Sequence, residues 1–324
     1  MNGSYRHTTA SKILHEILHY RRRFSGSDQD ISLENELVIL TQLPRIQTFV
    51  SANLPIHFIL PAFPAKSPNP NKVLGTVPDM AEKLALTFLN ALCENIKAHY
   101  APGARLTICS DGHVFSDLIN VNDDTINTYQ GKIKALIHDE QLSCLDVLNL
   151  GDIDEFAALT DDYDVLRSTL LQGYADPLED IRTFLINDED GTRLYRAITR
   201  FMFEDGLMPD YQGSKTALQR DARQRAYGVI QSSWAWGNLL AQCFPDAIRL
   251  SIHPQPASSL KMGIHMLPTK DDWLTPWHGT AVEVDGTFLL MKKTEAVELN
   301  AEPVWVDGRH SHYTLDSRKS VAHA

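Results

Sequence analysis

Three short apolar runs alternate with helical patterns in the first half of the chain, and this alternation limits the fold more than any other feature. The runs are PIHFIL (55–60), RLTIC (105–109) and CLDVLNL (144–150). Apolar residues recur every fourth position over 79–100, which is typical of an amphipathic helix. Strands linked by helices pair in parallel through right-handed crossovers. The sequence therefore predicts an α/β fold with a Rossmann-like, mostly parallel central sheet flanked by helices.

Both ends of the chain show other patterns. Residues 1–53 predict an N-terminal helical segment, with one helix over 10–23 and a second over 31–52 that Pro44 interrupts. Residues 307–324 are polar and predict a loose tail.

The long middle part, residues 54–306, is expected to form a single α/β domain. Its region 152–245 reads as mainly helical and forms an insertion between the third strand and a fourth at 248–253. The turn Val284-Asp-Gly-Thr287 lies between apolar runs and predicts an antiparallel C-terminal hairpin.

Charge and hydropathy restrict the partners. The net charge is −11, and a protein of this sign repels nucleic-acid backbones, so no nucleic-acid partner is expected. No apolar stretch is long enough to span a bilayer, and the N-terminus lacks the apolar core of a secretory signal. A cytoplasmic protein without a membrane partner is the resulting expectation. A small anion can still bind where cations gather.

The sequence contains little evidence of common cofactor-binding or metal-binding motifs. His15-Glu-Ile-Leu-His19 matches HExxH, but the predicted helix is short and ends in arginines, and no third ligand is evident. The dinucleotide motif GxGxxG, the P-loop and the serine-hydrolase motif GxSxG are absent. The sequence predicts neither a metal site nor a cofactor.

Polar residues follow the first two predicted strands, where ligands bind in parallel sheets. A proline-rich loop carries Lys66, Ser67 and Lys72, and lysine ammonium and serine hydroxyl groups suit phosphate. Asp111 follows the second strand and could receive a ligand amine. A solvated surface turn is the alternative interpretation of the loop, and Asp-Gly is also a common turn.

Two histidines lie beside apolar segments and prolines, His253 in RLSIHPQP and His278 in LTPWHG. Histidine at a strand end can transfer protons near neutral pH. Trp277 could form a flat wall for a ring. Core positions for all three are the alternative interpretation.

Four segments in order resemble the isocyanide (isonitrile) synthase family, also called the pyoverdine/dityrosine biosynthesis family. They are PAFPAKSPNPNKVLGTVPDMAE (61–82), YAPGARLTICSDGHVF (100–115), RLSIHPQP (249–256) and TPWHGTAVEVDG (275–286). The resemblance implies an enzyme of secondary metabolism, with 54–306 as its catalytic domain. Such enzymes convert the amino group of tyrosine or tryptophan to an isonitrile, with the carbon from ribulose 5-phosphate and no cofactor. The expected pathway partner is a non-haem iron/2-oxoglutarate oxygenase.

The resemblance also suggests roles for the residues at these motifs. The hypothesised catalytic residues are His253 and His278, as an acid/base pair, together with Lys66. The hypothesised contacts to phosphate or sugar oxygens come from Lys66, Ser67, Lys72 and Arg249. Asp111 is expected to bind the ammonium group of the amino acid, and Lys261 its carboxylate group. The amino acid's ring is expected to lie against Phe115 and Trp277.

Two other functions fit the same features. One is a transferase that uses a phosphosugar or a nucleotide sugar, and the other is a non-catalytic protein that binds a phosphorylated metabolite.

Overall fold

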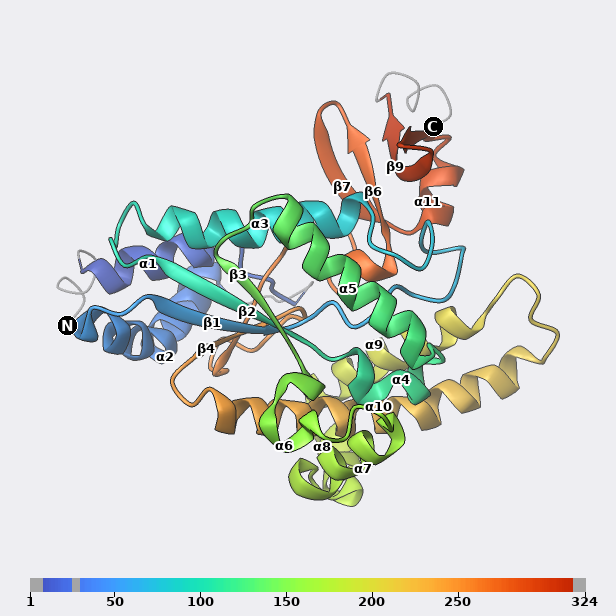
Figure 1. Ribbon diagram of the computed structural model, residues 1–324, viewed down its shortest axis with the longest axis horizontal. Helices are drawn as coiled ribbons and strands as arrows, with labels where there is room; N and C mark the ends of the chain where they lie inside the picture. Colours follow the sequence, from blue (N-terminus) through green and yellow to red (C-terminus); the bar gives the residue numbers. More distant parts are fainter. Residues whose placement is uncertain (1–7, 25–29, 317–324) are drawn as a thin grey trace.

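A parallel sheet forms the centre of the protein in the computed structural model, which describes residues 8–24 and 30–316 (Figure 1). Within these residues its five strands run in the order β3-β2-β1-β4-β5, and every neighbouring pair is parallel. The strands are β1 (Ile56–Pro61), β2 (Ala104–Ser110), β3 (Leu145–Asn149), β4 (Ile248–Ser251) and β5 (Lys261–Gly263). The predicted α/β fold is confirmed.

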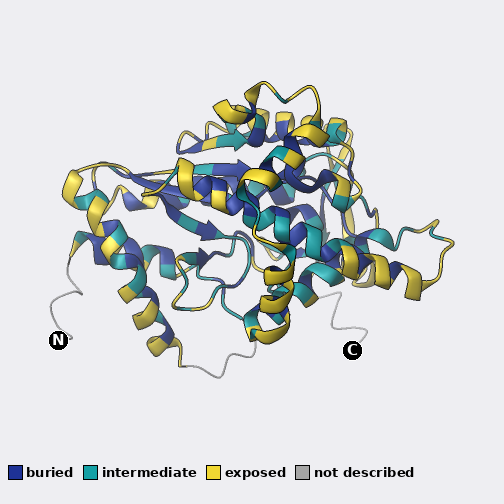
Figure 2. Ribbon diagram, turned by 90° about the horizontal axis from the view of Figure 1, so that it is seen from below, coloured by how far each residue is buried: buried dark blue, intermediate teal, exposed yellow. Residues whose placement is uncertain are grey.

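Helices cover both faces of this sheet. Helices α1 (Thr9–Leu18), α2 (Ile31–Ala52) and α3 (Met80–Ile96) share one core with the sheet, and α10 (Lys215–Cys243) packs in a second core. In Figure 1 α3 lies above the sheet and α10 below it. Strand residues alternate between the two sides, so Phe58 packs in the core with α1 to α3, whereas Ile59 packs with the core on the α10 side. Figure 2 shows the result, with buried strands inside and exposed residues on the outer helix surfaces.

The order of the strands indicates where a ligand would bind. The chain adds β2 and β3 on one side of β1, and then β4 and β5 on the other side. The direction of winding therefore reverses between β1 and β4. In open parallel sheets ligands bind at the carboxyl ends of the strands next to such a reversal.

Two predictions at the N-terminus are corrected. The first helix ends at Leu18, because residues beyond it leave the helix, and Arg22 N–H instead donates to the carbonyl of Gly263. Pro44 does not interrupt the second helix, which continues to Ala52. Its buried residues, Val38 and Ile46 among them, hold it to the protein across the proline.

The helical insertion is confirmed as mainly helical. Its elements are η2 (Leu150–Asp152), α6 (Asp154–Ala157), α7 (Tyr163–Tyr174), α8 (Leu178–Asn187), α9 (Glu189–Gly206) and α10. The segment between β2 and β3 holds α4 (Gly112–Ile119) and α5 (Asp123–Asp139). Helix α10 packs against α9, α4 and α7, and this brings the insertion over the edge of the sheet.

A second sheet follows at the C-terminus. Its strands in the described chain are β6 (Thr280–Val284), β7 (Thr287–Met291), β8 (Glu302–Val306) and β9 (Arg309–Leu315), in the order β7-β6-β9-β8, with α11 (Lys293–Glu298) between β7 and β8. The predicted hairpin is confirmed, and Asp285 and Gly286 take positive φ angles of 49° and 80° at its turn.

The expected loose tail is wrong for the residues of β9. This strand pairs with both β6 and β8, and Tyr313 is buried against Val282 and Ala296. Residues 317–324 of the expected tail lie outside the described residues. None of the helices in the described ranges is long and apolar enough to cross a membrane.

Candidate active site

A pocket opens where the winding of the sheet reverses. It holds about 720 Å³ of empty space, its open mouth included. Its walls come from the loops after β1, β2 and β4, from the segment before β6, and from α4, α9 and α10. Of the ten predicted site residues, seven line it: Lys66, Ser67, Asp111, Phe115, His253, Trp277 and His278. The structure therefore brings together residues that are up to 212 positions apart in the chain, from Lys66 to His278. Lys72, Arg249 and Lys261 lie outside its lining.

Lys66 is fully buried and ion-paired. Its Nζ lies 2.6 Å from Glu82 Oε2 and 2.9 Å from Asp79 Oδ2, and Asp79 and Glu82 form the capping box of α3. Burial alone would lower the pKa of Lys66, but the two carboxylates raise it above its usual value. Two acids thus neutralise this cation, and it ties the β1 loop to α3.

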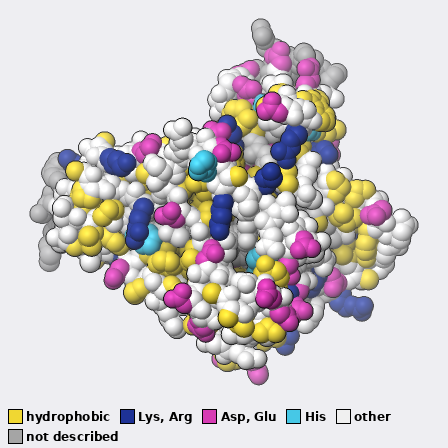
Figure 3. Space-filling model, viewed as in Figure 1, with side chains coloured by type: hydrophobic (Ala, Val, Ile, Leu, Met, Phe, Trp, Pro, Cys, Tyr) yellow, Lys and Arg dark blue, Asp and Glu magenta, His cyan; other side chains and the backbone are white. Residues whose placement is uncertain are grey.

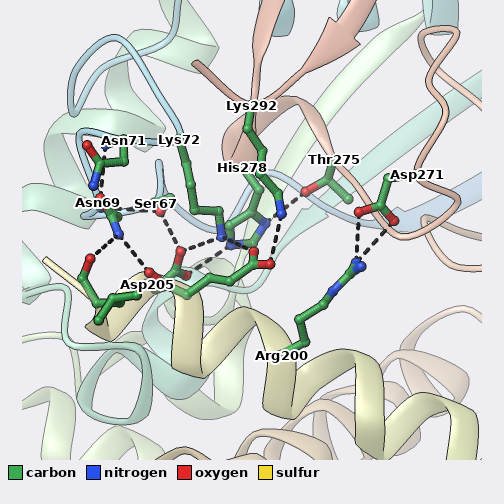
Figure 4. A network of polar contacts seen from close by, with 12 residues as sticks. Ser67, Asn69, Asn71, Lys72, Arg200, Asp205, Asp271, Thr275, His278 and Lys292 are labelled. Atoms are coloured by element: carbon green, nitrogen blue, oxygen red, sulfur yellow. Dashed lines mark hydrogen bonds and ion pairs between the residues drawn. The ribbon is translucent and has the colours of Figure 1, made fainter. Parts of the chain in front are cut away.

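Lys72 takes part in a second buried network, shown in Figure 4. Its Nζ lies 2.5 Å from Asp205 Oδ1 and 3.6 Å from Glu204 Oε2, at the end of α9. Ser67 Oγ donates to the same Asp205 oxygen at 2.6 Å. Burial would raise the pKa of Asp205, but Lys72 and His278 hold it well below its usual range. Asp205 is therefore an anion that orients three side chains.

Both ring nitrogens of His278 have partners. Nε2 lies 3.3 Å from Asp205 Oδ2, and Nδ1 lies 3.0 Å from Thr275 Oγ1. The ring also stacks on Phe201, with centroids 5.0 Å apart. Burial, followed by the charge of Lys72, lowers the pKa of this imidazole. His278 is held in one orientation as a neutral ring.

His253 differs because its buried Nδ1 has no hydrogen-bond partner among the described residues. It follows β4, and its ring lies 5.1 Å from that of Trp273. Burial, with smaller contributions from Arg22 and His278, lowers its pKa to about 3. At neutral pH the ring is uncharged and carries a nitrogen that is free to act on a ligand.

Asp111 is the second unpartnered group in the pocket. It precedes α4 without capping it through its side chain, and its buried Oδ1 has no partner in the described part of the chain. Burial raises its pKa to about 7. The next residue must be glycine, because a Cβ at Gly112 would lie 2.3 Å from the carbonyl oxygen of Pro64. The loops after β1 and β2 therefore meet at close range beside this carboxyl group.

The rest of the wall is largely apolar and aromatic. Phe115 breaks the helical dihedrals of α4, with φ −145°, and lines the pocket. Trp277 is 2% exposed and packs on Phe63, with ring centroids 5.1 Å apart. The other apolar residues of the lining include Ile119, Val121, Ile198, Met202, Val229, Ile252 and Trp273. Such a wall suits a flat aromatic side chain.

Sequence reasoning missed four residues that shape the site. Phe201 and Asp205 lie one turn apart on α9, and Thr275 orients His278. Arg22 is buried and donates to the carbonyls of Ile252 and Leu274, so it joins the two histidine loops. The amphipathic pattern of α9 is the only sequence feature that points to Phe201 and Asp205. The run of three arginines does not distinguish Arg22 from its two neighbours.

Metal ligands are not grouped in this site. No cluster of three or more histidine, cysteine, aspartate or glutamate side chains within residues 8–24 and 30–316 could hold a metal ion. His15 of the HExxH match has its Nδ1 2.7 Å from the carbonyl oxygen of Ser11. On the face shown in Figure 3, lysines and arginines of the described residues are interspersed with acids and form no continuous basic band.

A parallel α/β sheet with an apolar pocket at its reversal point, holding acid and base groups that have no partner within the described chain, is the arrangement of an enzyme for a small molecule. The family of pyoverdine/dityrosine biosynthesis proteins matches residues 46–304, and the chain belongs to this family.

Several relatives are similar over nearly the whole chain. An L-tyrosine isonitrile synthase of Xenorhabdus nematophila is 58% identical, over 95% of this chain and 92% of the relative. An L-tryptophan isonitrile synthase of Fischerella ambigua is 41% identical, over 97% of both chains. The crystal structure of the PvcA protein from Pseudomonas aeruginosa matches with a TM-score of 0.93 at 56% identity, over 95% of this chain and 100% of that one.

Proposed function

We propose that this chain is an isonitrile synthase that converts the α-amino group of L-tyrosine to an isocyanide. The observation that carries the proposal is the 58% identity to an L-tyrosine isonitrile synthase over 95% of the chain. Tyrosine is preferred to tryptophan in this proposal because the relative named for tryptophan is only 41% identical. The apolar pocket and its free carboxyl group supply what an aromatic amino acid needs.

The unpartnered groups define how the amino acid binds. Asp111 receives the ammonium group, since a buried carboxylate oxygen without a partner among the described residues gains most from an opposite charge. Phe115 and Trp277 enclose the ring. His253 Nδ1 then takes a proton from the ammonium group, so that the neutral amine can act as a nucleophile.

The carbon donor in this proposal is ribulose 5-phosphate, as the family resemblance implies. The amine attacks the ketone carbon and forms a C–N bond, and the carbonyl oxygen becomes a hydroxyl group that leaves as water to give an imine. His253 returns its proton to that oxygen in this proposal, and His278, which Asp205 and Thr275 hold in one orientation, orients the sugar. Later steps break carbon–carbon bonds and leave one carbon on nitrogen.

The same proposal extends to the setting of the reaction. The enzyme acts in the cytoplasm, in the biosynthesis of a secondary metabolite and without a redox cofactor. A non-haem iron/2-oxoglutarate oxygenase then consumes the isonitrile.

The function is tested by incubating the purified chain with L-tyrosine and uniformly ¹³C-labelled ribulose 5-phosphate. We expect a product with the infrared stretch of an isonitrile and with one labelled carbon, and a lower yield from L-tryptophan. A product without an isonitrile would contradict the proposal and favour a transferase. Ligand-dependent thermal stabilisation without any product would contradict it in favour of a binding protein.

The Asp111→Asn variant tests the ammonium site through pH. Because the ionised carboxylate binds the amine, kcat/KM for L-tyrosine in the wild type should rise with pH through about 7. In the variant this rise with pH should disappear. Its kcat/KM should also fall about 10- to 100-fold, which is the contribution of a charged hydrogen bond. A rising limb that persists unchanged in the variant would exclude Asp111.

Stability gives a second readout of the same carboxyl group. The folded pKa lies above the unfolded value, so the wild type loses stability as pH rises from about 4 to 7 and the buried group ionises. Asp111→Asn should therefore unfold at a higher temperature than the wild type at pH 8, and the difference should shrink toward pH 4.

A further inference from the structure

The cations of the predicted site fall into two groups. Lys66 and Lys72 each contact two carboxylates, within 2.9 Å and 3.6 Å respectively. Arg249 and Lys261 contact no carboxylate within the described residues, although both are half-buried. An anionic ligand that met Lys66 or Lys72 would compete with acids already in place, whereas one that met Arg249 or Lys261 would not.

Arg249 and Lys261 lie side by side on the sheet. They are register partners on the parallel strands β4 and β5, so their side chains leave the same face. This face is the one that α10 covers, because a Cβ at Gly237 would lie 3.0 Å from Arg249 Nη2. The absence of a side chain at Gly237 leaves room for the guanidinium group.

Nothing in the described protein neutralises this pair. Arg249 Nε is buried and has no hydrogen-bond partner among the described residues. Burial and, as the smaller cause, the charge of Arg249 lower the pKa of Lys261 to about 8. Two like charges held this close in a poorly solvated place destabilise the fold, unless an anion offsets them.

We propose that Arg249 and Lys261 form the phosphate-binding site of the enzyme, and that they hold the phosphate group of its sugar substrate. This proposal rests on the proposed function for the identity of that substrate. A phosphate monoester carries close to two negative charges at neutral pH, and these match the two cations. The amino-acid carboxylate expected for Lys261 carries only one.

The pair lies outside the pocket lining, and α10 runs from the pocket to it. Val229 and Ser233 line the pocket, and Gly237 follows one turn later on the same face of the helix, against Arg249. On the other side, His253 follows Arg249 by four residues, and the charge of Lys261 contributes to the low pKa of this imidazole. A phosphate on the pair would anchor the sugar at one end, with its reacting carbon toward His253.

The test compares Arg249→Met and Lys261→Met with Arg220→Met and Lys132→Met, which remove exposed cations elsewhere. Methionine keeps the apolar stem and deletes the charge. Calorimetry with ribulose 5-phosphate should show binding about 10- to 100-fold weaker in the first two variants, the value of a charged hydrogen bond, and unchanged in the controls. Unphosphorylated ribulose should bind all five proteins, the wild type included, equally weakly.

Two further readouts separate the pair from a structural role. Without ligand, both variants should unfold at the wild-type temperature or above, and inorganic phosphate should stabilise the wild type more than either variant. KM for ribulose 5-phosphate should rise with little change in KM for L-tyrosine, and Arg249→Lys should restore part of the affinity.

Three results would overturn the proposal: wild-type affinity for ribulose 5-phosphate in both methionine variants, an equal or larger loss for L-tyrosine, or no binding of any phosphate compound by the wild type. Because binding is measured without turnover, these results are distinct from those of the isonitrile assay. Loss of phosphosugar binding in the variants would support the site even if no isonitrile formed.

Discussion

His253→Ala should lower kcat by about 10²- to 10⁴-fold, the usual contribution of a general acid or base, while both substrates still bind. His253 is the imidazole in the pocket whose buried nitrogen has no partner among the described residues. Its low pKa keeps the ring neutral over the working range, so its free nitrogen still carries a lone pair when the ammonium group binds. Turnover at saturating substrate concentrations measures the loss in kcat, and calorimetry with each substrate shows whether binding is retained.

Two other histidines serve as controls. His138→Ala removes an imidazole whose side chain is 89% exposed and should leave kcat unchanged. His278→Ala should reduce kcat less than His253→Ala, because Asp205 and Thr275 already occupy both nitrogens of His278. If His253→Ala retained wild-type turnover, or if His278→Ala had the larger effect, the assignment of the proton acceptor would be contradicted.

Lys66→Ala should destabilise the protein by about 3–5 kcal/mol, because it removes one partner of a buried ionic cluster. Asp79 and Glu82 would stay next to the emptied space, with Glu82 completely buried. Burial, which is only partly offset by Lys66, already raises the pKa of Glu82 to about 7. Urea denaturation at pH 8, where Glu82 is mostly ionised in the wild type, measures the loss in the free energy of unfolding.

The matched control is Lys83→Ala. Lys83 Nζ pairs with Glu140 at the same 2.6 Å, but both side chains are more than a third exposed. The expected loss is about 0–1 kcal/mol, as for other surface pairs. Equal losses in the two variants would contradict the structural role of Lys66. The combination Lys66→Met with Glu82→Gln should be less destabilised than Lys66→Ala, because it leaves less unpaired charge.

Much of the architecture follows from local patterns in the sequence. The apolar runs of β1, β2 and β3 and the four-residue period of α3 are visible without tertiary information, and the parallel-sheet rule then converts strand ends into one site. This reasoning brought Lys66, Asp111 and His253 to one pocket. Strand β9 was missed because polar residues such as His310 and His312 conceal its alternation.

Pairing between distant side chains could not be read from the sequence. Asp205 arrives through the packing of α9, 133 positions after Lys72, so the neutralisation of Lys72 was invisible. The three-residue strand β5 has too few residues to predict a register, and this register is what joins Lys261 to Arg249. Local periodicity therefore located the site, whereas the distribution of charge within it needed the structure.

The most direct test of the account is a crystal structure of the protein with L-tyrosine bound. We expect the amino nitrogen within hydrogen-bond distance of Asp111 Oδ1 and on the side of the pocket that holds His253, with the ring against Phe115 and Trp277. Tyrosine bound outside this pocket, or inside it with the amino group turned away from Asp111, would contradict the account.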